Sequence, residues 1–496
     1  MMEQEINTLV GAFSNVLRPY NRRPRILKNP KMVFWDTEFD DKGLISSQFA
    51  WFEGDALKSK IMFLNDLDRE KLYNIITGLV GKEGRIFVIS HFAQSELKHL
   101  SDLWELDLSV YHKSMYAQYK NIHFVDSYAH FLCGLDKIGK SVGVPKIEIG
   151  DWIKDMRGLL KHNPELFKRY ALRDVEVLAK AWVKRRDFMI ETFGIDILNC
   201  VTIAQSSLVA FKVNYLREPL EPLKYYWSKK VRRENEGWKE YWVKDYYYGG
   251  SRDRRYYALK SYWGGRREAF GRGLLKCPIE IWDVKSMYPH MALLPLPLKD
   301  TRWFYTEDLT DIDSLEGFIN CKFKFDDDVD YPCLPVMHSK FPKLLFPKEG
   351  ETFCTIPEVR LALRLGCTVS NPKIWGFYPT RYEENHPLKD YILKCMEIKE
   401  NAEKGSVEYE TAKLLMNSII GKFMQRNPLY AVEDALDLLR SMGYDFDALR
   451  DYLAKQKTRQ MLRRPKFVSK DWSPEWGTII LGLSIPSIWD FSLKPV

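Results

Sequence analysis

The chain carries the stretch Ile-Trp-Asp-Val-Lys-Ser-Met-Tyr-Pro at residues 281–289. Its first residues continue an apolar, strand-like run that starts at Ile279, and the stretch then turns at Lys285 and Ser286 and enters a short helix. Asp283 therefore stands where a strand ends. A strand that passes through a short turn into a helix predicts an α/β unit in the second half of the chain.

A long helical pattern lies downstream, from Leu388 to Phe423. It ends with Lys-Leu-Leu-Met-Asn-Ser-Ile-Ile-Gly-Lys-Phe at residues 413–423. Lys413 and Asn417 are four residues apart, so they share one face of the expected helix. The pair puts one cation and one amide side by side on that face.

The first third of the chain alternates short β-rich runs with helical stretches, which predicts another α/β unit. One run, Val-Phe-Trp-Asp-Thr-Glu at residues 33–38, puts Asp36 and Glu38 two apart on a strand. Both carboxylates then point to one face and can hold a divalent cation. Such a pair is weak when it stands alone, because alternating acids are common on solvent-exposed strands.

Two later stretches add to this pair. The first, Ser-His-Phe-Ala-Gln-Ser-Glu-Leu-Lys-His-Leu at residues 90–100, ends a strand and starts a helix with Glu96 in its first turn. In the second, Tyr170 and Asp174 stand four residues apart on one face of a helix expected from about Pro164 to Thr192.

In this order the three stretches resemble the Exo I, Exo II and Exo III motifs of DEDD-type 3′→5′ exonucleases, in the version with tyrosine. The resemblance implies hydrolysis of phosphodiester bonds with two Mg²⁺ or Mn²⁺ ions in each active site. Asp36, Glu38 and Asp174 would hold the metals, Glu96 would assist, and Tyr170 would orient the attacking water.

Two positions depart from the exonuclease pattern. The family has Asn after the His and Asp as the second-motif acid, whereas this chain has Phe92 and Glu96. The extra methylene of Glu96 shifts its carboxylate by more than about 1 Å, which lowers a rate without abolishing binding. Asp126 is the rival for this role. We place it second because Asp126 and Ser127 match an Asp-Ser element that these exonucleases use near the single strand.

The downstream stretches resemble family B DNA polymerases. Residues 283–289 match motif A, DxxSLYP, with Met287 in place of Leu. Residues 413–421 match motif B, KxxxNSxYG, with Ile420 in place of the Tyr that packs at the nascent base pair. Residues 262–265, Tyr-Trp-Gly-Gly, match the YxGG element that links exonuclease and polymerase, and they lie at a better distance from motif A than a second copy further upstream.

By that resemblance Asp283 binds both catalytic metals, and the ring of Tyr288 excludes a 2′-OH. The residues expected at the incoming dNTP are Ser286, Met287, Tyr288, Lys413 and Asn417. The residues expected at primer-template and single-stranded DNA are Ser127, Tyr262, Gly264, Gly265, Arg266, Arg267 and Lys422.

The resemblance also implies a domain order. An N-terminal extension at 1–30 precedes an RNase H-like DEDD 3′→5′ exonuclease domain at 31–200 and a basic aromatic linker with the YxGG element at 201–277. The incomplete α+β palm and helical fingers of a right-hand DNA polymerase would follow at 278–496. This layout looks like the protein-primed branch of phages, adenovirus-like elements and linear plasmids, in which an insertion between motifs A and B grips a terminal protein.

The net charge of +8 is concentrated in one segment. Residues 224–276 hold 15 Lys and Arg, 6 Asp and Glu, and 14 aromatic residues. Cations interleaved with stacking platforms suit a nucleic-acid strand. The alternative is a solvated charged face with buried aromatics between the charges. For DNA binding we expect a salt dependence that is carried by Arg254, Arg255, Arg266 and Arg267.

The third element of family B, motif C or YxDTDS, has no match where it belongs. Residues 472–477, Trp-Ser-Pro-Glu-Trp-Gly, resemble its lead-in, and the sequence stops at Val496. Acidic stretches at 310–314 and 444–447 precede the lead-in, and we interpret them, like the acids at 326–330, as surface acids. DNA synthesis is therefore expected to need a second chain that supplies motif C and the thumb.

Two hypotheses from other classes stay open. A stand-alone DNA exonuclease with a vestigial polymerase half would degrade DNA and never extend it. A non-catalytic strand-holding protein would bind DNA without metal and without turnover.

Composition narrows the class of protein. A chain of 496 residues with 45% hydrophobic residues should fold into several domains. The eight Cys are scattered without a CxxC pair, so neither a disulfide framework nor a structural zinc is expected. The longest apolar run, from Thr478 to Trp489, is too short for a membrane span and contains Pro486. We expect a protein of the host cytoplasm or of an organelle, neither secreted nor membrane-bound.

Overall fold

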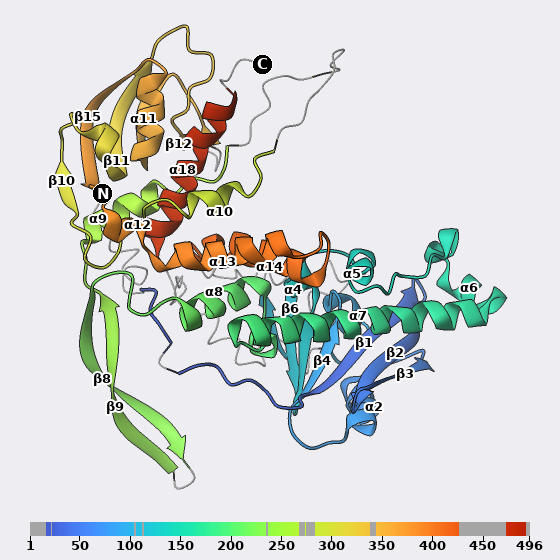
Figure 1. Cartoon of the computed structure of the whole chain (residues 1–496). Coiled ribbons are helices and arrows are strands. Elements are labelled where there is room, and N and C mark those ends of the chain that lie inside the picture. Colours follow the sequence, from blue (N-terminus) through green and yellow to red (C-terminus); the bar gives the residue numbers. More distant parts are fainter. Residues whose placement is uncertain are drawn as a thin grey trace.

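The computed structural model describes residues 16–20, 22–103, 106–111, 114–234, 237–266, 273, 283–337, 344–425 and 473–492. The first half of the chain builds an α/β unit around one large sheet (Figure 1). The second half builds a smaller antiparallel sheet with helices beside it. The predicted α/β class is confirmed for the first half, whereas the antiparallel sheet makes the second half α+β. The strand expected to run from Ile279 to Asp283 lies outside the described residues up to Trp282.

The large sheet consists of β1 (Lys31–Asp40), β2 (Gly43–Glu53), β3 (Ala56–Phe63), β4 (Ile86–Ser90), β5 (Asp107–Tyr111), β6 (Ser114–Tyr119) and β7 (Ile122–Asp126). Their spatial order is β3-β2-β1-β4-β7-β6-β5. β1, β4 and β7 are parallel, and the other neighbours are antiparallel. β1 is buried on both faces, because Phe34 packs into one hydrophobic cluster while Val33 and Trp35 pack into another.

The helical elements of this half are α2 (Arg69–Val80), α3 (Gln94–Leu97), α4 (Tyr128–Phe131), α5 (Leu135–Ser141), α6 (Met156–His162), α7 (Pro164–Phe193), α8 (Ile203–Asn214) and the 3₁₀ helices η2 (Gly150–Lys154) and η3 (Ile197–Asn199). α7 packs on β1, β2 and β3, and α2 packs with Val33 and Trp35 on the other face of β1. α7 starts where the Asn163 side chain accepts the N–H of Leu166 at 3.0 Å, with proline at the first helical position. It ends at Gly194, whose φ is +65°. The helix expected over this range is confirmed.

A two-stranded hairpin follows α8. It consists of β8 (Leu223–Glu234) and β9 (Gly237–Tyr248), and α9 (Arg252–Lys260) comes directly after it. The hairpin projects away from the rest of the protein at the lower left of Figure 1. It forms a sheet of its own, separate from the other sheets of the described chain.

The second half has a four-stranded antiparallel sheet in the order β10-β15-β11-β14, formed by β10 (Phe304–Thr306), β11 (Glu316–Phe325), β14 (Glu349–Thr355) and β15 (Cys367–Phe377). A small ladder joins β12 (Val336–Met337) to β13 (Leu344–Leu345). The helical elements of this half are α10 (Met287–Met291), η4 (Ile312–Ser314), α11 (Ile356–Arg364), α12 (Arg381–Glu384), α13 (Pro387–Asn401), α14 (Val407–Phe423) and α18 (Pro474–Ser492).

The long helix expected from Leu388 to Phe423 is two helices. α13 ends at Asn401, and α14 starts where the Ser406 hydroxyl accepts the N–H of Tyr409 at 3.2 Å. Gly405, with φ +89°, and the capping Ser406 mark the break, and both are local signals that the expectation of one helix overlooked.

One hydrophobic cluster joins the two halves. Phe211 of α8 contacts Tyr391 of α13, Phe423 of α14 and Trp476 of α18, with ring centroids 5.9 to 6.4 Å apart. The helices of the second half are therefore packed directly on the α/β unit. None of the helices in the described part of the chain combines the length and hydropathy that crossing a membrane requires.

Candidate metal centre

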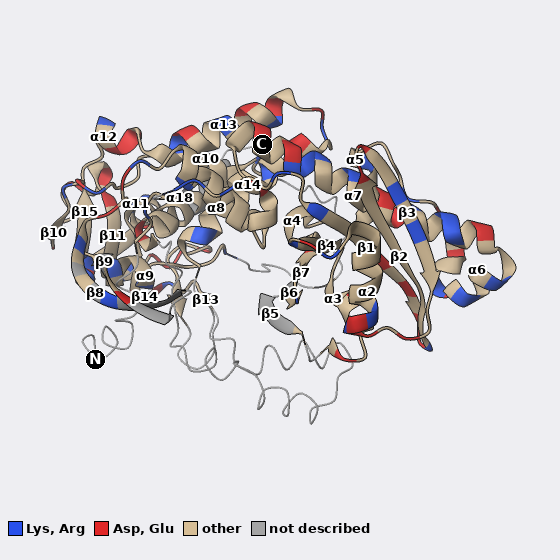
Figure 2. Cartoon of the chain, turned by 90° about the horizontal axis from the view of Figure 1, so that it is seen from below, with Lys and Arg blue, Asp and Glu red and all other residues tan. Residues whose placement is uncertain are grey.

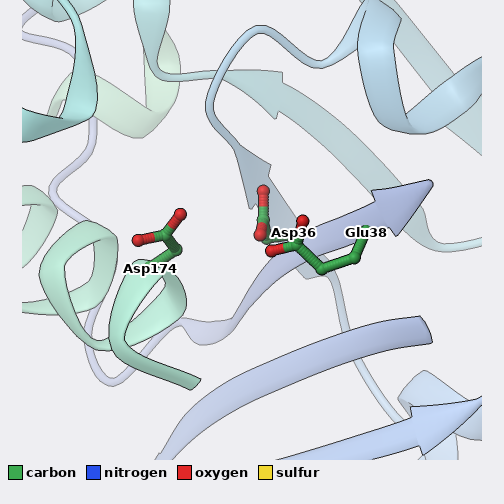
Figure 3. A group of neighbouring side chains, drawn as sticks. All are labelled: Asp36, Glu38 and Asp174. Atoms are coloured by element: carbon green, nitrogen blue, oxygen red, sulfur yellow. The ribbon is translucent and has the colours of Figure 1, made fainter. Parts of the chain in front are cut away.

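Three carboxylates meet where β1 faces α7. Asp36 and Glu38 extend from β1, and Asp174 extends from α7 toward them (Figure 3). One oxygen of each carboxylate lies within 4.8 Å of the others. The alternation of a strand puts the two β1 acids on one face, as expected, and the packing of α7 brings the third. Such a spacing suits oxygen ligands around divalent cations.

The electrostatics of this group also fit a cation. Burial, and then the charge of Asp174, raise the pKa of Asp36 to about 7. Burial and the neighbouring Asp36 raise the pKa of Glu38 well above its usual range. Oδ1 of Asp174 is buried and has no hydrogen-bond partner in the protein. A divalent cation would satisfy that oxygen and remove the repulsion among the three charges.

A side-chain amide on the neighbouring strand donates hydrogen bonds to two of the three acids. Nε2 of Gln48, on β2, donates to Oδ2 of Asp36 at 2.6 Å and more weakly to Oε1 of Glu38 at 3.5 Å. The β1–β2 register places Gln48 directly opposite Asp36. Gln48 therefore fixes the direction in which the Asp36 carboxylate points.

Lys146 is a residue of this centre that sequence reasoning missed. Its Nζ lies 2.6 Å from Oδ2 of Asp174 and 3.4 Å from the Tyr170 hydroxyl, to which it donates. Burial raises the pKa of Tyr170 to about 12, so its hydroxyl stays protonated. Lys146 stands in a loop, where no periodicity indicates its direction, and only the packed structure reveals its position.

Glu96 and Asp126, the two rivals for the second-motif acid, have different environments. Glu96 is 3% exposed, and its Oε2 has no hydrogen-bond partner in the protein. Burial, and then the charge of Asp36, raise its pKa well above the usual range. Oδ1 of Asp126 accepts the backbone N–H groups of Phe92 and Tyr128, both at 2.9 Å. Oδ2 of Asp126 is also buried without a partner in the protein, so the unpaired oxygen does not separate the two acids. The charge of Asp36 acts on Glu96, which favours Glu96, although Glu96 is not one of the three acids within 4.8 Å.

Of the two residues that depart from the exonuclease pattern, Phe92 has a strained backbone. Phe92 has φ +66°, in the left-handed region that Asn tolerates far better than Phe. Its ring lies edge-on against Tyr128, with centroids 5.6 Å apart. Ser127, expected near single-stranded DNA, is fully buried, and its hydroxyl lies 2.9 Å from Nδ1 of His91. In this structure Ser127 therefore contacts the protein interior.

Asp283, expected to bind the catalytic metals of synthesis, is exposed and precedes the residues expected at the incoming nucleotide. Ser286 follows with φ +55° and precedes α10. Nζ of Lys399, on α13, donates to the Ser286 hydroxyl at 2.9 Å, a contact that the sequence did not predict. Gly265 lies against Tyr288, since a Cβ on this glycine would stand 3.3 Å from the Tyr288 hydroxyl oxygen. Parts of motif A and of the YxGG element thus meet.

Lys413 and Asn417 lie on one exposed face of α14, as expected. The Asn417 side chain donates to the Lys413 carbonyl at 2.7 Å. Ile420 points the other way and is 5% exposed in the shared hydrophobic cluster. Nζ of Lys422 donates to Oε1 of Gln425 at 2.6 Å.

The expectation that Arg254 and Arg255 lie on a DNA-binding surface is wrong. The two residues are 7% and 0% exposed. Arg255 forms ion pairs with Glu221 and Glu475, and Arg254 donates to the Tyr248 hydroxyl at 2.7 Å. A run of charged residues favours a surface, but partners far away in the sequence compensate these cations in the interior.

The other basic residues expected at DNA follow the YxGG element. Nη1 of Arg266 donates to the Pro332 carbonyl at 2.7 Å, and its guanidinium lies 4.1 Å from the centre of the Phe346 ring. Arg267 lies outside the described residues. Within the element itself, Tyr262 packs against the main hydrophobic cluster, and Trp263 donates to the Phe353 carbonyl at 2.6 Å.

The acids interpreted as surface residues are exposed where the structure describes them. Oδ2 of Asp311 accepts the Tyr378 hydroxyl at 2.7 Å, and Asp313 and Asp326 are exposed. The stretch at 444–447 lies outside the described residues. Across the described chain, Asp36, Glu38 and Asp174 form the one group of three or more metal-type ligands at such spacing.

Comparison with known proteins gives a family, one curated relative and solved structures of similar fold. The family of type B DNA polymerases, organellar and viral, matches residues 152–445. The primer-independent DNA polymerase PolB of Escherichia coli is 35% identical over 115 residues, which cover 22% of this chain and 13% of that protein. The chain thus matches only a small part of this curated relative.

Solved structures of Phi29 DNA polymerase share the fold. The ternary complex with primer-template DNA and incoming nucleotide has a TM-score of 0.53 at 16% identity, over 81% of this chain and 69% of that one. The binary complex with primer-template DNA has a TM-score of 0.51 at 17% identity, over 79% and 68% of the two chains.

Proposed function

This chain belongs to the organellar and viral type B DNA polymerases, and from that premise we propose that it removes nucleotides from 3′ ends of DNA at the carboxylate centre and takes part in DNA synthesis through its second half. The observation that carries the first part is the meeting of Asp36, Glu38 and Asp174 within 4.8 Å. Single-stranded DNA and the primer terminus of a primer-template are the proposed substrates.

Asp36, Glu38 and Asp174 would hold two Mg²⁺ or Mn²⁺ ions. Bound there, the ions would lower the pKa of a water molecule and offset the charge on the phosphate. The fit rests on the buried, unpaired Oδ1 of Asp174 and on the mutual repulsion of the three acids. Glu96, with its own unpaired Oε2, would stand behind them as the fourth acid.

The remaining side chains orient the reaction. The protonated Tyr170 hydroxyl can direct a lone pair of the attacking water at the phosphorus, while Lys146 fixes both Tyr170 and Asp174. The water oxygen bonds to phosphorus, the bond from phosphorus to the 3′ oxygen breaks, and the leaving oxygen gains a proton. The products are a nucleoside 5′-monophosphate and a shortened strand with a 3′-OH.

For synthesis, Asp283 would be a ligand of the catalytic metals, and the turn at Ser286, Met287 and Tyr288 would receive the dNTP. The contact between Gly265 and Tyr288 supports this, because it joins the YxGG element to the turn. Lys413, Asn417 and Lys422 would face the triphosphate and the DNA from α14. A terminal protein and a second chain with motif C and a thumb are the proposed protein partners, and the host cytoplasm or an organelle is the proposed location.

The nuclease is tested with 5′-labelled single-stranded DNA and Mg²⁺ or Mn²⁺. We expect stepwise shortening from the 3′ end that EDTA stops and that the Asp36→Ala/Glu38→Ala variant lacks. Equal degradation by this variant and the parent would refute the site. Binding without any cleavage, with or without metal, would favour a strand-holding protein.

Synthesis is tested with a primed template and dNTPs, with and without an added fragment that carries YxDTDS. We expect extension when the fragment is present, and its loss in Asp283→Ala. Degradation that is never joined by extension would favour a stand-alone exonuclease. Parallel reactions on unprimed template, with and without a candidate terminal protein, would identify the mode of priming.

A further inference from the structure

The β8–β9 hairpin exposes an unusual set of aromatic side chains. Trp227 and Trp242 are 60% and 64% exposed, and Tyr225 and Tyr241 are 55% and 44% exposed. Exposure of large apolar rings to water is unfavourable in free energy, so a group of them on a surface usually marks a binding site for a partner. A two-stranded ribbon has no core of its own in which they could be buried.

Three of these rings share one face. Tyr225, Trp227 and Lys229 alternate along β8, so their side chains point to the same side. Trp242 is the cross-strand partner of Lys229 and joins that face. Tyr241 is on the opposite face. Lys229 on this face is ion-paired with Glu240. One side of the hairpin is thus a ladder of rings, which we call the aromatic ladder (Tyr225, Trp227 and Trp242).

The distance between successive rings of the ladder indicates which kind of nucleic acid can stack on it. Side chains on one face of a strand recur about every 6.8 Å, twice the rise per residue. Successive nucleotides of a duplex strand are only about 3.4 Å apart along the helix axis. One base on each ring therefore requires a strand that is unstacked and extended, which single-stranded DNA can be and a duplex cannot.

The charge of the hairpin is complementary to such a strand. Residues 223–248 contain seven Lys and Arg, four Asp and Glu, and nine aromatic residues. Figure 2 shows Lys and Arg positions along both strands of the hairpin, at the left of that view. The excess of cations suits a phosphate backbone, and the rings suit its bases.

The base of the hairpin is firmly attached. The N–H of Gly249 donates to the Pro222 carbonyl at 2.8 Å, which closes the ribbon. Tyr248, at the end of β9, is 5% exposed, and its hydroxyl lies 3.4 Å from Oε1 of Glu475 on α18. α9 then leads directly to Tyr262 of the YxGG element. The base of the hairpin is therefore anchored to the second half and joined to that element through α9.

We propose that the β8–β9 hairpin is an arm that binds single-stranded DNA, with bases stacked on the aromatic ladder and phosphates along the basic side chains. The inference rests on the proposed function only for the identity of the nucleic acid. It adds a binding surface outside the carboxylate centre, and its test requires neither cleavage nor synthesis.

The test measures binding of a fluorescein-labelled oligo-dT in EDTA, so that no strand is cut. We expect Trp227→Ala/Trp242→Ala to weaken this binding at least tenfold, since each stacked base contributes about 1–3 kcal/mol and 1.4 kcal/mol is tenfold. Trp227→Phe/Trp242→Phe should retain most of the affinity. Tyr305→Ala/Tyr331→Ala is the matched control, because these rings are 46% and 48% exposed outside the hairpin. It should bind like the parent.

Binding of a duplex of equal length distinguishes the contribution of base stacking from that of charge attraction. The Trp227→Ala/Trp242→Ala variant should bind the duplex about as well as the parent does. An equal loss for single strand and duplex, or no loss for either, would overturn the proposal. Unchanged DNA binding together with loss of a dimer in size-exclusion chromatography would instead assign the ladder to protein contact. Circular dichroism and melting of the variants would verify that both fold.

Discussion

Nζ of Lys146 lies 2.6 Å from Oδ2 of Asp174, so a loop cation directly contacts one of the three acids of the candidate metal centre. Its second contact, to Tyr170 at 3.4 Å, makes it a positioning residue for both side chains. Removal of a side chain that orients a metal ligand typically costs 10–100-fold in metal affinity or activity.

Lys146→Met should therefore lower the 3′→5′ cleavage rate about 10–100-fold and raise the Mg²⁺ concentration needed for half-maximal activity. Lys146→Arg, which keeps the cation, should recover part of both. The measurement is a metal titration of cleavage for the three proteins. A drop in rate with an unchanged metal requirement would mean that Lys146 does not act through Asp174. Lys140→Met, at an exposed lysine on α5, is the control.

The repulsion among the acids predicts a trade-off between stability and activity. Asp36→Asn removes one buried charge and should raise the melting temperature in EDTA by about 2–4 °C, the shift expected from about 1 kcal/mol in a domain of this size. The same variant should lose cleavage. Asp55→Asn, at an exposed turn residue, should change neither. A lower melting temperature for Asp36→Asn in EDTA would show that the carboxylates do not repel one another.

The buried position of Arg255 predicts an effect on stability and none on salt dependence. Arg255→Met leaves Glu221 without its ion-pair partner and leaves Glu475 with Arg254 alone, 3.8 Å away, and should cost about 3–5 kcal/mol in the free energy of unfolding. The dependence of DNA binding on salt should keep its slope, because a buried cation displaces no counterions from DNA. Denaturant unfolding and binding at several salt concentrations measure the two effects. Arg252→Met, on the exposed side of the same helix, is the control, and its free energy of unfolding should equal that of the parent.

A buried histidine predicts a loss of stability in mild acid. Nδ1 of His386 accepts the N–H of Lys389 at 3.2 Å, and Nε2 faces the Leu294 carbonyl at 3.0 Å. Burial lowers the pKa of His386 from 6.5 to about 4. The unfolded chain binds a proton near pH 6.5, while the folded chain does not until about pH 4. The free energy of unfolding therefore falls as the pH falls through this window.

Between pH 7 and pH 5 this histidine should lower the free energy of unfolding by about 2 kcal/mol. His386→Gln should be less stable than the parent at pH 7, because it loses hydrogen bonds, but it should lose less stability on acidification. Denaturant unfolding at the two pH values measures the difference. The exposed His162, replaced by Gln, should leave the parent's pH dependence unchanged. If the free energy of unfolding fell equally for His386→Gln and the parent between pH 7 and pH 5, His386 would not be the source of the acid sensitivity.

The periodicity of the sequence predicted those features of the fold that depend on local backbone geometry. The two-residue alternation placed Asp36 and Glu38 on one face of a strand, and β1 confirms it. The boundaries expected for the helix that carries Asp174 were correct, because a capping Asn, a proline at its start and a glycine at its end are all local signals.

Long-range packing explains what the sequence could not predict. Lys146 reaches Asp174 from a loop, and the contact of Lys399 with Ser286 joins residues 113 positions apart. Arg254 and Arg255 lie in a basic run, and their burial depends on Glu475, which stands more than 200 positions later. Charge counts along a sequence do not reveal such partners.

The ion pair between Arg255 and Glu475 also has a consequence for the newly made protein. The two residues are 220 positions apart, so a ribosome that adds about 5–20 residues per second needs roughly 10–45 s to travel from one to the other. During that time Arg255 has no access to Glu475, and α9 cannot yet bury its arginines in their final surroundings. The sheet around β1, whose strands are all made by residue 126, can assemble meanwhile. The half of the molecule that holds the candidate metal centre is therefore expected to mature on the ribosome before the half that holds α18.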